Sequence, residues 1–133
     1  MKKYVTGALV MGVLFSACEK EPGVGGKAEI RGHVYTVEYD DFTEQPTGVA
    51  YYTPEHRVYI VYGDNDHFDD DTRTGPDGEF RFSWLRKGSY RVFTYSECHP
   101  DSCDSGVKEV RFSVEIEDRK EVRELPDLVI ENW

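Results

Sequence analysis

From Ala28 to the C-terminus, apolar and polar residues alternate in short runs, as they do in strands that bury one face. The clearest runs are "AEIRGHVYTVEY", "HRVYIVYG", "EFRFSW", "SYRVFTYS" and "VRFSVEIE", and polar turns separate them. The last segment, "EVRELPDLVIENW", contains Pro126, so it is expected to form an edge strand or two short pieces. No helical period is sustained over three turns. The pattern therefore predicts an all-β chain, a single antiparallel β-sandwich of about seven strands over residues 28–133.

Alternation also predicts which side chains face the core between the two sheets. In "EFRFSW" the core-facing set is Phe80, Phe82 and Trp84, and "DDFTEQPTG" is expected to interrupt the strands with a polar loop. Elsewhere the expected inward-facing residues are Ile30, Gly32, Val34, Val58, Ile60, Tyr62, Tyr90, Val92, Thr94, Val110, Phe112, Val114 and Ile116.

The N-terminal segment has a different pattern, in which two lysines precede an uncharged apolar stretch that ends in Ser16-Ala17-Cys18. The stretch is short for a permanent membrane span, which needs about 20 apolar residues. It resembles the signal peptide and lipobox of bacterial lipoproteins, with residues 1–17 removed and Cys18 acylated. The alternative is a signal peptide cut near Ala17 without lipidation. Residues 18–27, rich in Gly and charge, are expected to form a flexible tether.

This resemblance implies a location and a first partner. An acylated Cys18 would hold the domain, residues 28–133, on a lipid bilayer. The acidic stretch after Cys18 is similar to the surface-export signal of lipoproteins from Bacteroidota, which implies an outer-membrane protein exposed at the cell surface. The chain carries 26 acidic and 16 basic residues, a formal charge of −10. It has no basic stripe, so we expect no nucleic-acid partner.

The stretch "TGPDGEFRFSWLRKGSYRVF" resembles the signature hairpin of carboxypeptidase-regulatory-like and related prealbumin-like (transthyretin-like) domains. In that signature a Thr and an acidic-Gly turn lead into an aromatic strand, followed by Leu, a Gly turn and Tyr-x-Val. The resemblance implies a prealbumin-like or Ig-like sandwich. The matching positions are Thr74, Asp77, Gly78, Phe80, Phe82, Leu85, Gly88, Tyr90 and Val92.

Catalytic patterns are absent from the sequence. It has no Gly-x-Ser-x-Gly, no His-Glu-x-x-His and no Gly-rich phosphate loop, and its four histidines are scattered singly. The chain ends in "VIENW", without the Tyr-Arg-Gly-Ser tail of transthyretin-like hydrolases. Asn132 finds no lysine in the first strand with which to form a pilin-type isopeptide bond. We therefore expect no enzyme activity.

Cys98 and Cys103, in "CHPDSC", are expected to form a disulfide that staples a hairpin tip, as is typical of an exported protein. The chain-entropy effect of so short a loop should be about 2 kcal/mol. The alternative is a metal site that combines the two thiolates with His99. Its spacing matches no standard zinc motif.

The aspartate-rich loop that follows "HRVYIVYG" is the second candidate metal site. Clustered carboxylates are the usual ligands of calcium, and a cation would relieve their mutual repulsion. The spacing is not that of an EF-hand, and a solvated turn explains the same residues. We therefore expect no required cofactor, and calcium is the one candidate ion for this loop. The candidate ligands are Asp64, Asp66, Asp69, Asp70 and Asp71.

The outward faces of the strands also carry apolar side chains, where polar ones would be usual. Tyr35 with Val37, Tyr59 with Val61, and Phe93 with Tyr95 are expected to form an apolar patch that binds a protein or a glycan. The alternative is that neighbouring loops or the C-terminal segment cover them. The sequence thus favours a non-catalytic binding or accessory module at the cell surface. The competing hypothesis is a structural or assembly component of the envelope without a ligand of its own.

Overall fold

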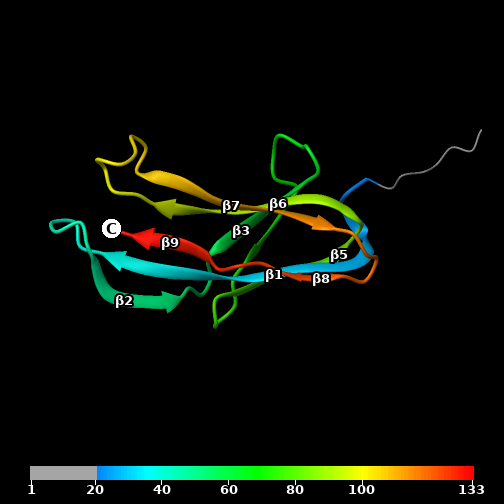
Figure 1. Cartoon of the computed structure of the whole chain (residues 1–133), viewed down its shortest axis with the longest axis horizontal. Helices are drawn as coiled ribbons and strands as arrows, with labels where there is room; N and C mark the ends of the chain where they lie inside the picture. The colour runs from blue at the N-terminus through cyan, green and yellow to red at the C-terminus, as the bar shows by residue number, and fades with distance from the viewer. Residues whose placement is uncertain (1–20) are drawn as a thin grey trace, which may run out of the picture.

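The computed structural model describes residues 21–133. The predicted signal peptide, 1–17, and the predicted lipidation site, Cys18, lie outside the described residues. Residues 21–133 form two β-sheets and contain no α-helix, which confirms the all-β prediction (Figure 1). Nothing in this part of the chain is a helix long and apolar enough to cross a membrane.

The two sheets contain nine strands, two more than the sequence predicts. The five-stranded sheet contains β1 (Val24–Tyr39), β2 (Pro46–Tyr52), β5 (Glu79–Leu85), β8 (Val122–Glu124) and β9 (Leu128–Asn132). The four-stranded sheet has the order β4-β3-β6-β7, with β3 (Arg57–Tyr62), β4 (Asp70–Arg73), β6 (Gly88–Glu97) and β7 (Val107–Ile116).

The additional strands come from segments that the sequence assigns to loops. Strand β2 begins at Pro46, inside the predicted polar loop, and all of its residues are exposed. Strand β4 lies in the aspartate-rich stretch, where Asp70 and Asp71 pair with Ile60 and Tyr59 of β3. Both are edge strands with one neighbour, so they need few buried side chains, and alternation does not reveal them.

Strand β1 is the centre of its sheet and pairs with four others. It is antiparallel to β2 and β5, but parallel to β8 and β9. The prediction of a purely antiparallel fold is therefore wrong at the C-terminus. Pro126 divides the last segment into two short strands, β8 and β9, which confirms the second of the two predicted alternatives.

One hydrophobic core lies between the two sheets, and both contribute to it. The inward-facing residues predicted from alternation are confirmed for most positions, and Tyr62, Val110 and Phe112 are only partly buried. The core also contains Ala28 of β1, Leu85 of β5, Leu125, and Leu128 and Ile130 of β9. The alternating apolar positions thus explain why these segments pair and which face each sheet buries.

Trp84 is the clear exception, because its side chain is 69 % exposed. Its backbone has φ +59°, in the left-handed region, and the pairing of β1 with β5 shifts register beside it. This bulge interrupts the alternation, so that Leu85 rather than Trp84 enters the core. The prediction that Trp84 is a core residue is wrong for this reason.

The glycine-rich stretch before the domain is packed rather than free from Gly23 onward. Strand β1 begins at Val24, inside the stretch 18–27 for which the sequence predicts a tether. A Cβ at Gly26 would lie 2.0 Å from the carbonyl oxygen of Leu85, so only glycine allows this approach. Here glycine serves close backbone packing against the β5 bulge.

The family-like stretch from Thr74 to Phe93 is not a hairpin, because β5 and β6 belong to different sheets. The turn after Leu85 carries the chain from one sheet to the other, so that Phe82 and Tyr90 enter the same core from different sheets. Thr74 is buried and donates a hydrogen bond to the carbonyl oxygen of Thr53, at 2.6 Å. Gly78, with φ +75°, leaves no room for a Cβ beside that segment.

Candidate functional site

The outer face of the four-stranded sheet carries a contiguous group of aromatic side chains. Tyr59 of β3 stacks on Phe93 of β6, with ring centroids 5.0 Å apart. Tyr95 lies edge-on to both rings, at 5.6 Å from Tyr59 and 5.7 Å from Phe93. Phe68 lies 4.9 Å from Tyr59. We call Tyr59, Phe68, Phe93 and Tyr95 the aromatic cluster.

Adjacent strand pairing explains why these residues meet. Tyr59 and Phe93 are register partners in the β3–β6 ladder, so their side chains stand on the same face. Tyr95 follows Phe93 by two residues, which returns it to that face. Within the cluster Phe93 is buried at 8 % exposure, whereas Tyr95 and Phe68 are 48 % and 46 % exposed. The cluster therefore has a supported base and two accessible rings.

The aspartate-rich loop places Phe68 over Tyr59. Asp69 accepts hydrogen bonds from the backbone N–H of Tyr62, at 2.7 Å, and from the side-chain amide of Asn65, at 3.0 Å. Arg91 donates to the carbonyl oxygen of Asn65. These bonds close the loop between β3 and β4, so part of its polar sequence has a structural role in holding an aromatic ring.

A charged pair borders the cluster. Arg57 donates a hydrogen bond from Nε to a carboxylate oxygen of Asp71, at 2.6 Å. Its guanidinium lies 5.1 Å from the ring centroid of Tyr59 and 6.0 Å from that of Phe68. The bond to Asp71 is the main cause that raises the pKa of Arg57. An arginine side chain is charged at any ordinary pH, so a cation borders the rings.

The five candidate calcium ligands do not share one structural role. Asp69 closes the loop, Asp71 pairs with Arg57, and Asp70 accepts a hydrogen bond from the backbone N–H of Asp71. Asp64 and Asp66 are exposed. Calcium binding by this loop stays a prediction, with three of its candidate ligands, Asp69, Asp70 and Asp71, already engaged by the protein.

Tyr35 is separated from the other three predicted binding residues, because it belongs to the five-stranded sheet. It packs edge-on to Tyr52 of β2, at 5.1 Å, and His33 packs on the same ring at 5.3 Å. The Tyr52 hydroxyl donates to Asp127, at 3.1 Å, and this hydrogen bond is the main cause that raises the pKa of Tyr52. The predicted patch is therefore divided between two sheets.

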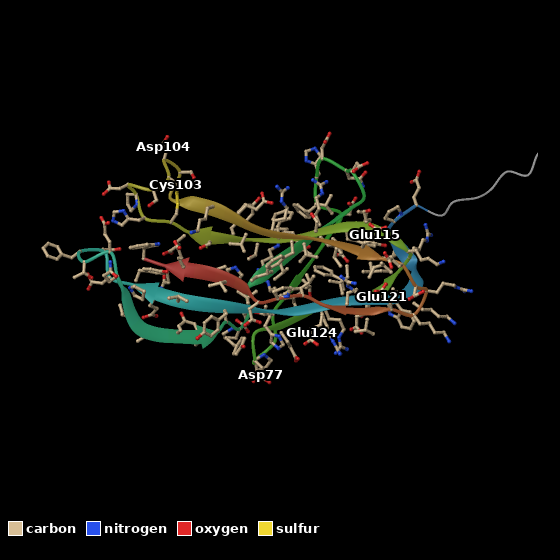
Figure 2. All side chains as sticks on the ribbon, viewed as in Figure 1. Asp77, Cys103, Asp104, Glu115, Glu121 and Glu124 are labelled. Carbon is tan, nitrogen blue, oxygen red and sulfur yellow. A yellow bond between two sulfur atoms is a disulfide. The ribbon has the colours of Figure 1, made fainter. Side chains whose placement is uncertain are left out.

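Cys98 and Cys103 are joined by a disulfide, with Cα atoms 6.3 Å apart, at the tip of the β6–β7 hairpin (Figure 2). The bond agrees with the predicted disulfide rather than with the alternative that used both thiolates as metal ligands. His99 beside them lies near carboxylates of Glu44, at 3.5 Å, and Asp101, at 3.7 Å. Within residues 21–133, one group of His, Cys, Asp or Glu side chains has its possible ligand atoms within 4.8 Å of one another, as a metal site would require. It consists of Glu44, His99 and Asp101.

Sequence reasoning missed Phe68, Arg57 and the exposure of Trp84. Phe68 is a single aromatic residue within a run of aspartates, and the sequence does not distinguish it from Phe42, a loop aromatic that is 96 % exposed. Arg57 and Asp71 meet through β4, a strand that the sequence did not predict.

Comparisons with known proteins support the fold. No family model matches the chain, and no curated protein matches it by sequence. Among solved structures, the chain is similar to a crystal structure described as a "putative carbohydrate binding protein" from Pseudomonas aeruginosa. The TM-score is 0.52 at 12 % sequence identity, over 80 % of this chain and 90 % of that one. At this identity the similarity extends to the all-β fold, and the resemblance to carboxypeptidase-regulatory-like domains remains an interpretation of the sequence.

Proposed function

We propose that this chain is a non-catalytic, glycan-binding module with a prealbumin-like sandwich fold, held at the cell surface by an acylated Cys18. The observation that carries the proposal is the aromatic cluster, with two accessible rings on a preformed base. The fold similarity to a protein described as carbohydrate-binding agrees with it.

The cluster has the chemistry that sugars require. A pyranose ring presents C–H groups on one face, and these pack on the electron-rich face of an aromatic ring. Hydroxyl groups at the ring edge need charged or polar partners, and Arg57 and Asp71 stand beside Tyr59 and Phe68. Because Phe93 and Tyr59 support the outer rings, binding requires little ordering of side chains.

Anchoring is supported by the sequence alone. The apolar leader that ends in Ser16-Ala17-Cys18 is the basis for proposing a lipoprotein of the outer membrane. A surface position would bring the aromatic cluster to extracellular or envelope polysaccharides.

A glycan array followed by affinity electrophoresis tests the binding. We expect retention of the purified chain by at least one polysaccharide. Tyr95→Ala and Phe68→Ala should each weaken binding about tenfold, the effect of losing about 1.4 kcal/mol. Tyr51→Ala is the matched control, because Tyr51 is 40 % exposed on β2 in the other sheet. Equal binding by all four proteins would exclude the aromatic cluster as the site.

If no glycan on the array binds the chain, the proposed glycan-binding function is contradicted. Stable co-purification of the chain with one envelope complex would then support the alternative, a structural component without a ligand of its own.

A further inference from the structure

A wide groove lies at the end of the domain where the described chain begins. It is bordered by the start of β1, the turn between β5 and β6, and the segment after β7, which meet at one end of the molecule (Figure 1). Its volume is about 1150 Å³. We call it the Trp84 groove, because the exposed Trp84 lines it.

The exposure of Trp84 is imposed by the backbone. A tryptophan with φ +59° occupies a region that costs a non-glycine residue about 1–3 kcal/mol unless the surroundings hold it there. The packed glycines of β1 and the burial of Leu85 hold this bulge. A large apolar side chain is thus presented to solvent by a strained conformation, which points to a contact outside the domain.

The charge at this end differs from that of the rest of the chain. Four basic residues, Lys27, Arg86, Lys87 and Arg119, line the groove together with three acidic ones, Glu21, Glu115 and Glu117. At the opposite end, residues 40–45 and 97–106 contain six acidic residues and no lysine or arginine. Figure 2 places Asp104 at that end and Glu115 near the groove. The groove is therefore the end of this acidic domain that an anionic surface repels least.

The chain joins the domain at Gly23, beside the Trp84 groove, and this limits the distance between the groove and an anchor at Cys18. Gly23 is fixed to the domain, since its N–H donates to the Tyr90 hydroxyl at 2.9 Å and its carbonyl accepts from Arg86 N–H at 2.8 Å. Pro22 packs on Gly88. The four residue steps from Cys18 to Pro22 span at most about 14 Å.

We propose that the Trp84 groove end docks on an anionic lipid surface, with Trp84 in the headgroup interface and Lys27, Lys87 and Arg119 facing the headgroup phosphates. Tryptophan is enriched at membrane interfaces because its ring is apolar and its N–H is polar. Lysine and arginine beside it add electrostatic attraction. The inference rests on the acylation of Cys18 in the proposed function. It orients the domain, with the acidic end away from the membrane.

Tryptophan fluorescence tests the docking, because the chain has two tryptophans, Trp84 and Trp133. The full-length chain is expressed with its leader, purified in its processed form and reconstituted into vesicles of phosphatidylglycerol and phosphatidylethanolamine. A second set of vesicles contains lipids brominated near the headgroup, which quench nearby indoles. Trp133→Phe leaves Trp84 as the reporter, and Trp84→Phe leaves Trp133, at the C-terminal end of the molecule, as the matched control.

Quenching and a blue shift of Trp84 emission, with Trp133 unaffected, are the expected results. Lys87→Glu should lower the docked-to-undocked ratio about fivefold, whereas Arg111→Glu, in the middle of β7, should leave it unchanged. Two results, obtained in vesicles that carry the protein, would overturn the docking but not the anchor. They are equal quenching of Trp84 and Trp133, and no quenching of either.

Vesicle flotation and mass spectrometry of Cys18 separate this failure from failure of the anchor. A chain that is not acylated and does not float would overturn both the anchor and the docking. Glycan binding by the aromatic cluster would be untouched by either result. In a separate measurement without vesicles, a water-soluble quencher would be added to the protein. If a carbohydrate protects Trp84 from that quencher, the groove is a sugar site and the lipid assignment is contradicted.

Discussion

Inward-facing and outward-facing aromatic residues of this domain differ in what holds them and in what they can do. Phe82 and Tyr90 lie in the core between the sheets, almost fully buried. Tyr95 and Phe68, on the outer face, keep nearly half of their surface accessible although aromatic neighbours support them. The first group stabilises the fold, and the second is available to a ligand. Trp84 belongs to the outward group through its bulge alone.

The largest expected effect separates two aromatics of one strand. Phe82→Ala should lower the free energy of unfolding by about 3–5 kcal/mol, because it leaves a cavity in the core. Trp84→Ala should change it by less than about 1 kcal/mol, since the side chain is mostly in solvent. Denaturant unfolding of both variants measures the difference. Equal losses would show that Trp84 is packed as alternation predicts.

Those two residues also show how far the sequence determines the fold. Alternation correctly places most of the core-facing positions of β1, β3, β6 and β7, because each buried face needs a large apolar side chain at every second residue. It does not predict that Val61 and Phe93, on the outward face, are also buried. It fails at Trp84, where a backbone bulge depends on glycines of a distant strand. It also fails at β2 and β4, whose pairing is made by main-chain hydrogen bonds rather than by buried side chains.

The candidate site was predictable in part. Tyr59, Phe93 and Tyr95 are recognisable as apolar residues at outward positions. Their grouping, and the separation of Tyr35, depend on which strands are neighbours, which a single sequence does not specify. Phe68 joins them through the loop that Asp69 closes, a tertiary contact without a local signature.

A smaller effect is expected from the buried hydroxyl of the inward group. Tyr90→Phe removes the acceptor of the Gly23 N–H and the donor to the Arg86 carbonyl, at 2.7 Å. Leaving such buried groups without partners should cost about 1–3 kcal/mol. Tyr95→Phe is the control, because its exposed ring should change stability by less than about 0.5 kcal/mol. Identical unfolding midpoints for the two variants would contradict the role of the Tyr90 hydroxyl.

The outer cluster should be nearly dispensable for folding. Tyr95→Ala removes edge contacts with Tyr59 and Phe93, which should cost about 0.5–1.5 kcal/mol. Thermal unfolding should therefore stay cooperative while glycan affinity falls about tenfold. A loss of stability as large as that of Phe82→Ala would place Tyr95 with the core residues instead.

The smallest expected effect is a pH dependence from His56, which is partly buried. Burial lowers the pKa of His56, although a hydrogen bond with the Tyr95 backbone opposes this shift. The unfolded chain then binds a proton more readily than the folded one, so stability should fall as the pH drops through about 6.5. Melting temperatures at about pH 7.5 and about pH 5.5 measure this loss, and His56→Gln should reduce it. An unchanged difference in that variant would assign the pH dependence to other groups.

Nitrogen–proton NMR mapping of a bound oligosaccharide tests the central claim most directly. The labelled chain would be titrated with the array-selected sugar, and amide shifts would be followed by residue. The largest shifts should fall on Tyr59, Phe68, Phe93, Tyr95 and their strand neighbours, with residues around Trp84 unmoved. Shifts confined to the Trp84 groove, or to β2 of the other sheet, would contradict the assignment of the outer face as the binding surface.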